Sequence, residues 1–425
     1  MERKYEIRCP IHGFIELDDW EWSIINQPAF QRLRRIRQLG LTDYVYPGAT
    51  HTRFEHSLGV MHVATRLYDA IVARSKNILQ KELQYNEDGL KRDRRIVRLA
   101  ALLHDVGHAP FSHASEELMP QKAHGSRFKH EDYTASIIRM ELREAIENHK
   151  INQINYDIKA ETIAQLIEGN SRLQKGLLFW QTLLISQLDA DRMDYLLRDS
   201  YHIGVRYGVY DLERLLNSVC AFTVRDESGE EKLTIGVSED GWHAAESLIL
   251  ARYYMFTQVY YHKTRRAYDY HITRALSDAL PDKSLPPPDT LRNIRKFLNF
   301  DDWWMLGMIS ANRAGEHGKI IKNRTHYRMV YSTPETPLPE EIERCNDLYQ
   351  RLRETMSVGQ VFMDTPEKSW YNPEKEEVWI WRDDAVPVLL HEYSHPVKGM
   401  QGIRQYRLYA APEVSQQAKG IVKEV

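Results

Sequence analysis

Cysteine is scarce in this chain, and the few cysteines lie far apart. Only Cys9, Cys220 and Cys345 occur among 425 residues. Their number is odd and they form no CxxC pair, which argues against a disulfide framework. We therefore expect a protein of a reducing, cytoplasmic compartment.

Long apolar runs and an excess of one charge are missing as well. No run of about 18 apolar residues occurs, and the opening segment MERKYEIRCPIHG has no apolar stretch of the kind that secretory signals carry. Lysine plus arginine (57) nearly balances aspartate plus glutamate (60). We therefore expect neither membrane insertion nor secretion. Nucleic acid is not a required partner, and any recognition of a polyanion must be local.

What the chain does have is helical periodicity. Apolar residues recur at spacings of three and four through most of the first 280 residues, as in amphipathic helices. The predicted helices include one ending at Gly40, one beginning behind Ser57, and one ending at a C′ Gly107. These three helices are expected over 31–40, 57–73 and 94–107. A fourth, very long helix is expected over 238–276. Two β-branched runs around a charged tip predict a hairpin near 221–237.

Proline clusters divide the chain. LPDKSLPPPDT (280–290) and STPETPLPEE (332–341) interrupt the periodic segments. Strands are expected beyond them, in 368–384 and 403–413. The sequence therefore predicts a mainly α protein, with a helical body over 1–280 and linker helices followed by a small α+β region over 281–425.

Two histidines and two aspartates form a candidate metal site. LLHDVGHAPFSH (102–113) supplies His104 and Asp105, HTRFEHS (51–57) supplies His56, and LDADRMDYLLRDS (188–200) supplies Asp191. This mixture of nitrogen and oxygen ligands suits Mn²⁺, Fe²⁺ or Mg²⁺ with open positions better than a closed structural zinc site. Each residue alone reads as an ordinary capping or core polar residue, so the prediction depends on their occurring together.

Further histidines and arginines near these segments suit phosphate chemistry. Imidazoles that titrate near neutral pH can donate a proton to a leaving oxygen, and the candidates are His108, His113 and His130. Arginine side chains can neutralise successive phosphate groups, and the candidates are Arg53, Arg192 and Arg252. Taken singly, each arginine is more often a solvated surface charge.

Six segments, in this order, resemble the HD-domain superfamily. They are RCPIHGFIEL, PAFQRLRRIRQLG, HTRFEHSLGV, LLHDVGHAPFSH, FKHED and LDADRMDYLLRDS. Specifically, they resemble the deoxynucleoside triphosphate triphosphohydrolases, which include bacterial dGTPases and the animal SAM-and-HD-domain enzyme. The resemblance covers about residues 5–270, and the tail resembles the family only in RQYRLYAAPE.

The resemblance implies an HD-domain helical bundle that uses a divalent metal ion, Mn²⁺, Mg²⁺ or Fe²⁺. The implied reaction converts a dNTP and water to deoxynucleoside and inorganic triphosphate. It also implies a dNTP substrate, a nucleotide activator and a homo-oligomer as partners.

The family's residue roles transfer to matching positions of this chain. The implied metal ligands are His56, His104, Asp105 and Asp191. The implied active-site histidines are His108, His113 and His130, and the last two hold the positions tied to protonation of the leaving group. The implied substrate-binding residues are Gln38, Leu39, Arg53, Arg192, Tyr195, Asp199, Arg252 and Tyr260.

The sugar and base contacts implied by the resemblance would set specificity. Gln38 and Asp199 match residues that hold the sugar 3′-hydroxyl, and Leu39 and Tyr260 match positions beside the base. Tyr195 matches an aromatic ring under the deoxyribose, where a 2′-hydroxyl would collide. The implied enzyme would therefore exclude ribonucleotides sterically.

The sequence also departs from the animal enzyme. Asn26 stands where that enzyme's allosteric guanine site has an aspartate, although Gln31 and Arg34 of the site are kept. Phe256 replaces a histidine near the triphosphate. We therefore do not expect activation by GTP through this site, whereas another nucleotide is compatible with it.

Other functions are also compatible with parts of the sequence. The chain could be a different HD phosphohydrolase, a nucleotidase or a phosphodiesterase, or a catalytically silent nucleotide sensor. VLLHEYSH (388–395) fits the HExxH pattern of zinc proteases. Pro396 directly after it disfavours a helix there, so a chance match is the preferred interpretation.

Overall fold

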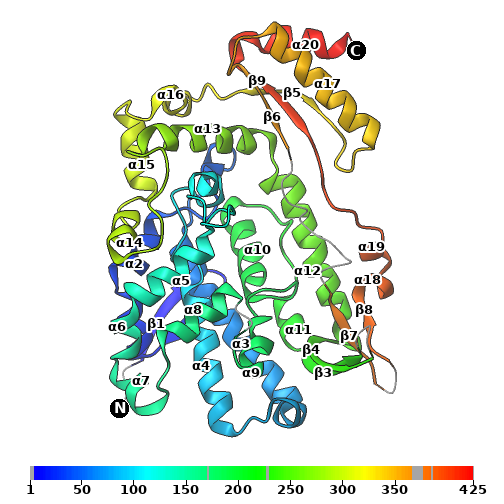
Figure 1. The fold of residues 1–425 in the computed structure, drawn as a ribbon. Coiled ribbons are helices and arrows are strands. Elements are labelled where there is room, and N and C mark those ends of the chain that lie inside the picture. The colour runs from blue at the N-terminus through cyan, green and yellow to red at the C-terminus, as the bar shows by residue number, and fades with distance from the viewer. Residues whose placement is uncertain (1–3, 170–171, 226–228, 366–376, 384–385, 425) are drawn as a thin grey trace.

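Helices dominate the computed structural model, which describes residues 4–169, 172–225, 229–365, 377–383 and 386–424. The prediction of a mainly α fold with a small α+β region is confirmed (Figure 1). No helix within these described ranges is long and apolar enough to span a membrane. The division of the chain at residue 280 stays a prediction.

The helical body surrounds the long helix α3 (Arg53–Leu83), which packs against α4 (Glu87–Leu103) and α10 (Ala190–Ile203). The shorter helices before and between these are α1 (Asp19–Ile25), α2 (Pro28–Gln31), α5 (His130–Met140), α6 (Arg143–Glu147), α7 (Lys150–Asn155), α8 (Ala160–Glu168) and α9 (Lys175–Gln181). Those that follow are α11 (Leu212–Leu216), α12 (Trp242–Met255), α13 (Lys263–Ala279), α14 (Leu291–Phe297), α15 (Asp302–Ser310) and α16 (Gly315–Asn323).

Three small sheets lie around this body. An N-terminal hairpin, β1 (Tyr5–Cys9) and β2 (Gly13–Leu17), was not predicted. The predicted hairpin near 221–237 is confirmed as β3 (Val219–Arg225) and β4 (Glu231–Ser238), and its tip at 226–228 lies outside the described residues. The other strands of that sheet are β7 (Trp379–Trp381) and β8 (Val388–Leu389). The remainder of the predicted strand segment 368–384 falls largely outside the described residues.

The third sheet belongs to a C-terminal layer at the top of Figure 1. In this sheet β9 (Arg407–Ala410) pairs antiparallel with β5 (Arg328–Ser332) and β6 (Val361–Asp364). Helices α17 (Pro339–Thr355) and α20 (Ser415–Lys423) share a separate apolar cluster with it, whereas the main core includes the short α18 (Leu390–Tyr393) and α19 (His395–Lys398).

Two predicted helix boundaries were wrong because tertiary pairing and capping override local periodicity. The predicted helix 31–40 ends with a 3₁₀ turn at Arg35, since the following residues extend and pair with the segment before α3. The backbone N–H of Gln38 donates to the carbonyl of His51 (3.0 Å). Helix α3 begins at Arg53 rather than behind Ser57, because the Thr52 N–H donates to the Glu55 carboxylate (3.2 Å).

The predicted long helix over 238–276 is broken. A 3₁₀ turn precedes α12, and a π-helical turn, Phe256–Tyr260, separates α12 from α13. This turn places the Tyr260 hydroxyl 2.6 Å from the Asp199 carboxylate on α10. Such π-turns occur frequently at functional sites, and this one contacts the candidate sugar-binding residues.

Gly107 is required for a different reason from the one predicted. Helix α4 ends at Leu103, and Gly107 is not in the left-handed conformation that a C′ glycine adopts. A Cβ atom at Gly107 would lie 2.3 Å from the Thr134 backbone nitrogen and 2.4 Å from the His130 carbonyl oxygen. The glycine therefore permits the loop after α4 to pack directly on α5.

Asp302, the first residue of α15, ties this loop to the segment before α3. Its two carboxylate oxygens accept the Phe111 N–H (2.7 Å) and the Arg37 N–H (2.8 Å). Phe111 and Ser112 both adopt left-handed conformations (φ 57° and 58°), which are costly for side chains of this kind. Burial raises the pKa of Asp302 to about 7 despite these hydrogen bonds.

We expect Asp302→Asn to change the pH dependence of stability. The folded-state pKa of Asp302, about 7, lies above the ordinary 3.8. The stabilisation from its bound proton is therefore complete below about pH 4 and is lost as the pH rises through about 7. Relative to the variant, the wild type should lose up to a few kcal/mol over this range, at about 1.4 kcal/mol per pKa unit.

Urea unfolding between pH 4 and 8 measures this difference, with the exposed Asp347→Asn as the matched control. If the Asp302→Asn and wild-type curves stay parallel over this range, Asp302 does not titrate as we expect.

Candidate metal centre and active site

The first turn of α3 places Arg53 and His56 on one face, three residues apart. His56 is fully buried, and its Nδ1–H donates to Asp194 Oδ2 (2.8 Å). This bond leaves the Nε2 lone pair directed at Asp105 and Asp191, with Nε2 2.9 Å from Asp191 Oδ1 and 3.6 Å from Asp105 Oδ2. A hydrogen bond that fixes the tautomer in this way is typical of metal-ligating histidines.

The end of α4 supplies the second imidazole and a carboxylate. His104 is the C-cap residue, and its Nδ1–H donates to the Ala101 carbonyl (2.8 Å), so its Nε2 is also left as a lone pair. That Nε2 lies 3.3 Å from Asp105 Oδ1 and 3.7 Å from Asp191 Oδ1. Asp191 is in the first turn of α10. The structure therefore brings all four predicted metal ligands together.

The donor set fits a divalent cation. The Nε2 atoms of His56 and His104 are buried without a hydrogen bond of good geometry in the described part of the chain. Burial alone would lower the pKa of His56, but the neighbouring carboxylates of Asp191 and Asp194 raise it to about 10. The carboxylates thus attract positive charge to this point, and a metal ion would supply that charge in place of a proton.

Asp194, one turn after Asp191 on α10, supports the site from behind. Besides His56, its carboxylate accepts hydrogen bonds from His12 Nε2 (2.6 Å) and from two nitrogens of Arg198 (both 2.8 Å). Burial would raise the pKa of Asp194, yet Arg198 and the histidines hold it well below its ordinary range. Position 59 of α3, which faces this carboxylate, accommodates only glycine, because a Cβ on Gly59 would lie 1.9 Å from Asp194 Oδ1.

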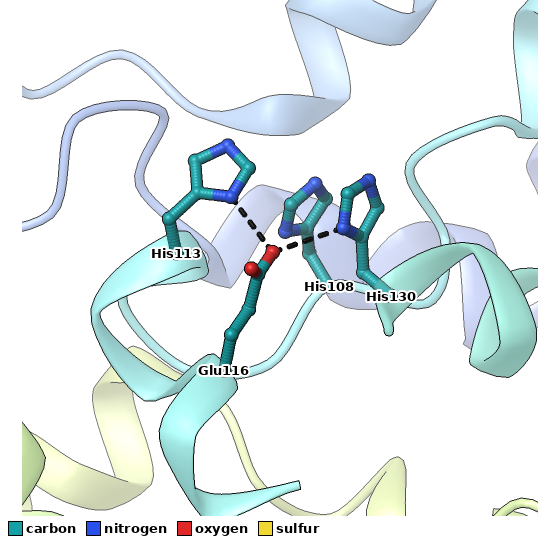
Figure 2. A group of neighbouring side chains, drawn as sticks. All are labelled: His108, His113, Glu116 and His130. Carbon is teal, nitrogen blue, oxygen red and sulfur yellow. Dashed lines mark hydrogen bonds and ion pairs between the residues drawn. The ribbon is translucent and has the colours of Figure 1, made fainter. Parts of the chain in front are cut away.

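The three predicted acid–base histidines also gather, next to Asp105. His108 Nε2 lies 3.1 Å from Asp105 Oδ1, and its ring stacks on that of His130 at 3.9 Å. Figure 2 shows that His113 and His130 both direct Nδ1 at one carboxylate, that of Glu116, at 2.7 and 3.0 Å. These hydrogen bonds outweigh burial and lower the pKa of Glu116. Glu116 therefore stays ionised and accepts a hydrogen bond from each histidine.

The predicted phosphate-binding arginines take different positions. Arg53 is buried and donates to Asp105 Oδ2 (2.5 Å) and to Ser112 Oγ (2.7 Å), which joins the metal set to the loop after α4. Arg192 pairs with Asp189, the N-cap residue of α10. Arg252, from α12, is buried and donates to Gln187 Oε1 (2.6 Å).

The predicted sugar-binding residues are joined in part. Asp199 accepts hydrogen bonds from the Tyr260 hydroxyl (2.6 Å) and from His51 Nε2 (2.7 Å). The Tyr195 ring lies 6.0 Å from that of Tyr260. The side chains of Gln38 and Leu39 lie outside this hydrogen-bonded group among the described residues, although the Gln38 backbone is bonded to His51.

The HExxH segment does not form a protease site. His391 and Glu392 lie in α18, which ends at Tyr393, and Ser394 is extended before His395 begins α19. The two histidines therefore do not share one helical face as a zinc protease requires. The described residues also show no metal-ligand group in this segment.

Comparison with known proteins decides the family. Residues 53–199 match the HD domain, and residues 211–424, half of the chain, match the HD-associated region. The chain belongs to the HD-domain family.

Two curated relatives each match about three quarters of this HD protein. An uncharacterized protein of Methanocaldococcus jannaschii is 37% identical over 76% of this chain and 58% of its own length. The deoxynucleoside triphosphate triphosphohydrolase SAMHD1 homologue of Dictyostelium discoideum is 33% identical over 75% of this chain and 59% of its own length. The chain thus spans somewhat over half the length of these relatives.

Solved structures share the whole fold. A hypothetical protein from Aquifex aeolicus is 28% identical, with a TM-score of 0.78 over 99% of this chain and 100% of its own. A phosphohydrolase from Bacteroides thetaiotaomicron, 24% identical, has the same fold with a TM-score of 0.70 over 96% of this chain and all of its own.

Several residues of the HD site were missed from sequence. Glu116 lies three residues after His113, and Asp194 lies four before Arg198, so helical spacing carried a signal for both. His12 and His51 contact carboxylates 182 and 148 residues away in the chain, which no local pattern reveals.

We expect loss of the Asp194 carboxylate to weaken metal binding without removing a ligand. Asp194→Asn takes away the acceptor that orients His56, and Gly59→Ala displaces the same carboxylate while keeping it. Losing such a supporting group lowers metal affinity by about 10- to 100-fold. Competition of Mn²⁺ between the protein and a chelator measures the affinity, and the exposed Asp88→Asn is the control. Unchanged affinity in both folded variants would exclude this role.

Proposed function

We propose that this HD protein is a metal-dependent dNTP triphosphohydrolase, which converts a dNTP and water to deoxynucleoside and inorganic triphosphate. One observation carries the proposal: the Asp105 carboxylate joins a candidate metal set, a buried arginine and a histidine–glutamate group within direct contact distances. The Dictyostelium relative, which is named as a deoxynucleoside triphosphate triphosphohydrolase, supports the same reaction. A nucleotide activator and self-association rest on the family resemblance alone.

The metal set would act at the α-phosphate. His56, His104, Asp105 and Asp191 would hold the ion, which when bound supplies a Lewis acid and lowers the pKa of a water. Arg53 lies against this set and would stabilise negative charge on a phosphate oxygen, as its guanidinium is already buried and fixed by Asp105 and Ser112. Arg192 and Arg252 would neutralise the outer phosphates.

Departure of the deoxynucleoside requires a proton on its 5′-oxygen. His113 is the more exposed of the two histidines bonded to Glu116, with 61% of its side chain accessible, whereas His130 is 18% accessible. His113 can therefore reach a substrate oxygen, while Glu116 stabilises the protonated ring and His130 holds Glu116 from the other side. We assign proton donation to His113.

The sugar would lie against α10. Asp199 would accept the 3′-hydroxyl, held in place by His51 and Tyr260. Tyr195, one helical turn before Asp199 on the same helix, would lie under the ring. A substrate bound in this way points its phosphates along α10 towards Asp191.

Turnover with identified products tests the proposal. We expect the protein with Mn²⁺ or Mg²⁺ to release inorganic triphosphate from at least one dNTP, alone or with a second nucleotide as activator. Asp105→Ala should lose both bound metal and at least about 99% of turnover, since it removes a ligand that also fixes Arg53. Asp88→Ala, on the exposed start of α4, should be fully active.

The products also separate the alternatives. Release of orthophosphate or of a nucleoside monophosphate would indicate a different HD phosphohydrolase. Tight nucleotide binding without product would indicate a silent nucleotide sensor.

Tyr195→Ala should relax discrimination against ribonucleotides. Removing the ring would make room for a 2′-hydroxyl, and a steric difference of this size corresponds to roughly 10- to 100-fold in relative kcat/KM. The measurement compares kcat/KM for a dNTP with that for the matching NTP, and Tyr195→Phe serves as the control because it keeps the ring. Equal discrimination in Tyr195→Ala and the wild type would remove Tyr195 from the sugar site.

A further inference from the structure

A second group of potential metal ligands lies beside the four-residue metal set. His108, His113, Glu116 and His130 each offer one ligand atom, and these atoms lie within 4.8 Å of one another. The residues come from the loop after α4, from the 3₁₀ turn Ser112–Leu118 and from the start of α5. Figure 2 shows the three imidazoles arranged around the Glu116 carboxylate.

In this group, His108 has a ring nitrogen that is available to bind a metal ion. Its side chain is 1% exposed, and its Nδ1 is buried without a hydrogen-bond partner among the described residues. Its other nitrogen, Nε2, lies 3.1 Å from Asp105. A buried imidazole nitrogen without a partner is costly, and a bound cation is one way to satisfy it.

The chemistry of this group differs from that of the first set. Three imidazoles and one carboxylate form a nitrogen-rich donor set, which Zn²⁺ binds with tetrahedral geometry. Ligand atoms around a tetrahedral zinc ion lie about 3.3 Å apart. Glu116 Oε1 already lies 2.7 Å from His113 Nδ1 and 3.0 Å from His130 Nδ1. To bind zinc, the two short Glu116–histidine distances would have to lengthen slightly. The longest distances between ligand atoms, up to 4.8 Å, would have to shorten by about 1.5 Å.

We propose that His108, His113, Glu116 and His130 form a second metal site that takes Zn²⁺, and that zinc bound there inhibits the enzyme. Coordination through Nδ1 requires His113 and His130 to give up the Nδ1–H bonds to Glu116. Each ring then binds as a neutral imidazole that carries its single proton on Nε2. His113 would no longer be protonated and held by Glu116, so the leaving oxygen would lack its acid. The inhibition rests on the proposed function, whereas the binding does not.

Zinc stoichiometry tests the binding without reference to activity. Equilibrium dialysis should give two zinc ions per wild-type chain, one in Glu116→Gln and one in Asp105→Ala, because each substitution removes a ligand of one site. Glu117→Gln, an exposed neighbour of Glu116, is the matched control and should bind two. Co²⁺ as a probe should show the intense visible absorption of a tetrahedral site in wild type and in Asp105→Ala, but not in Glu116→Gln.

A separate turnover experiment tests the inhibition by zinc. With Mn²⁺ saturating the first site, micromolar Zn²⁺ should lower wild-type turnover at least tenfold, and a zinc chelator should restore it. Equal zinc stoichiometry in wild type and Glu116→Gln overturns the second site. Two zinc ions without inhibition overturn the regulatory role alone. A protein that binds two zinc ions but hydrolyses no nucleotide contradicts the proposed function and leaves the zinc site established.

Discussion

The Asp105 carboxylate is the point through which the parts of the site are connected. One oxygen faces His104 and His108, and the other faces Arg53 and His56. The residue is fully buried, and burial alone would raise its pKa, but Arg53 and the neighbouring histidines hold it well below its ordinary range. An ionised carboxylate in a low-dielectric setting requires compensating positive charge nearby. Arg53 provides such charge, and a metal ion bound by the candidate ligands would add to it.

Rigid support behind this carboxylate comes from residues far apart in the chain. Asp194, held by His12 and Arg198, orients His56 from α10. Asp302, at the start of α15, holds the strained backbone of Phe111 that leads from Asp105 to His113. The helices beyond residue 280 therefore contribute directly to the geometry of a site whose candidate ligands all precede residue 200. Such preorganisation lowers the reorganisation that a reaction would otherwise require.

The residues of the candidate metal set could be predicted from sequence, whereas several helix boundaries could not. His56, His104, Asp105 and Asp191 were selected because the four potential ligands occur together in the same group of segments, and the structure places their side chains side by side. The helix start at Arg53 and the break at Phe256–Tyr260 were missed because a capping box and a tertiary contact to Asp199 override apolar periodicity. The contact between Glu116 and His113 could have been predicted from their three-residue spacing. The contacts of His12 and His51 could not, because they depend on how distant segments of the chain pack.

In the proposed reaction, water attacks the α-phosphorus of a dNTP at this site. Hydrolysis in ¹⁸O-labelled water with Mn²⁺, followed by mass spectrometry of both products, tests this point of attack. Attack at phosphorus should place one ¹⁸O atom in the released triphosphate and none in the deoxynucleoside. Label in the deoxynucleoside, or release of a shorter phosphate in place of triphosphate, would contradict it.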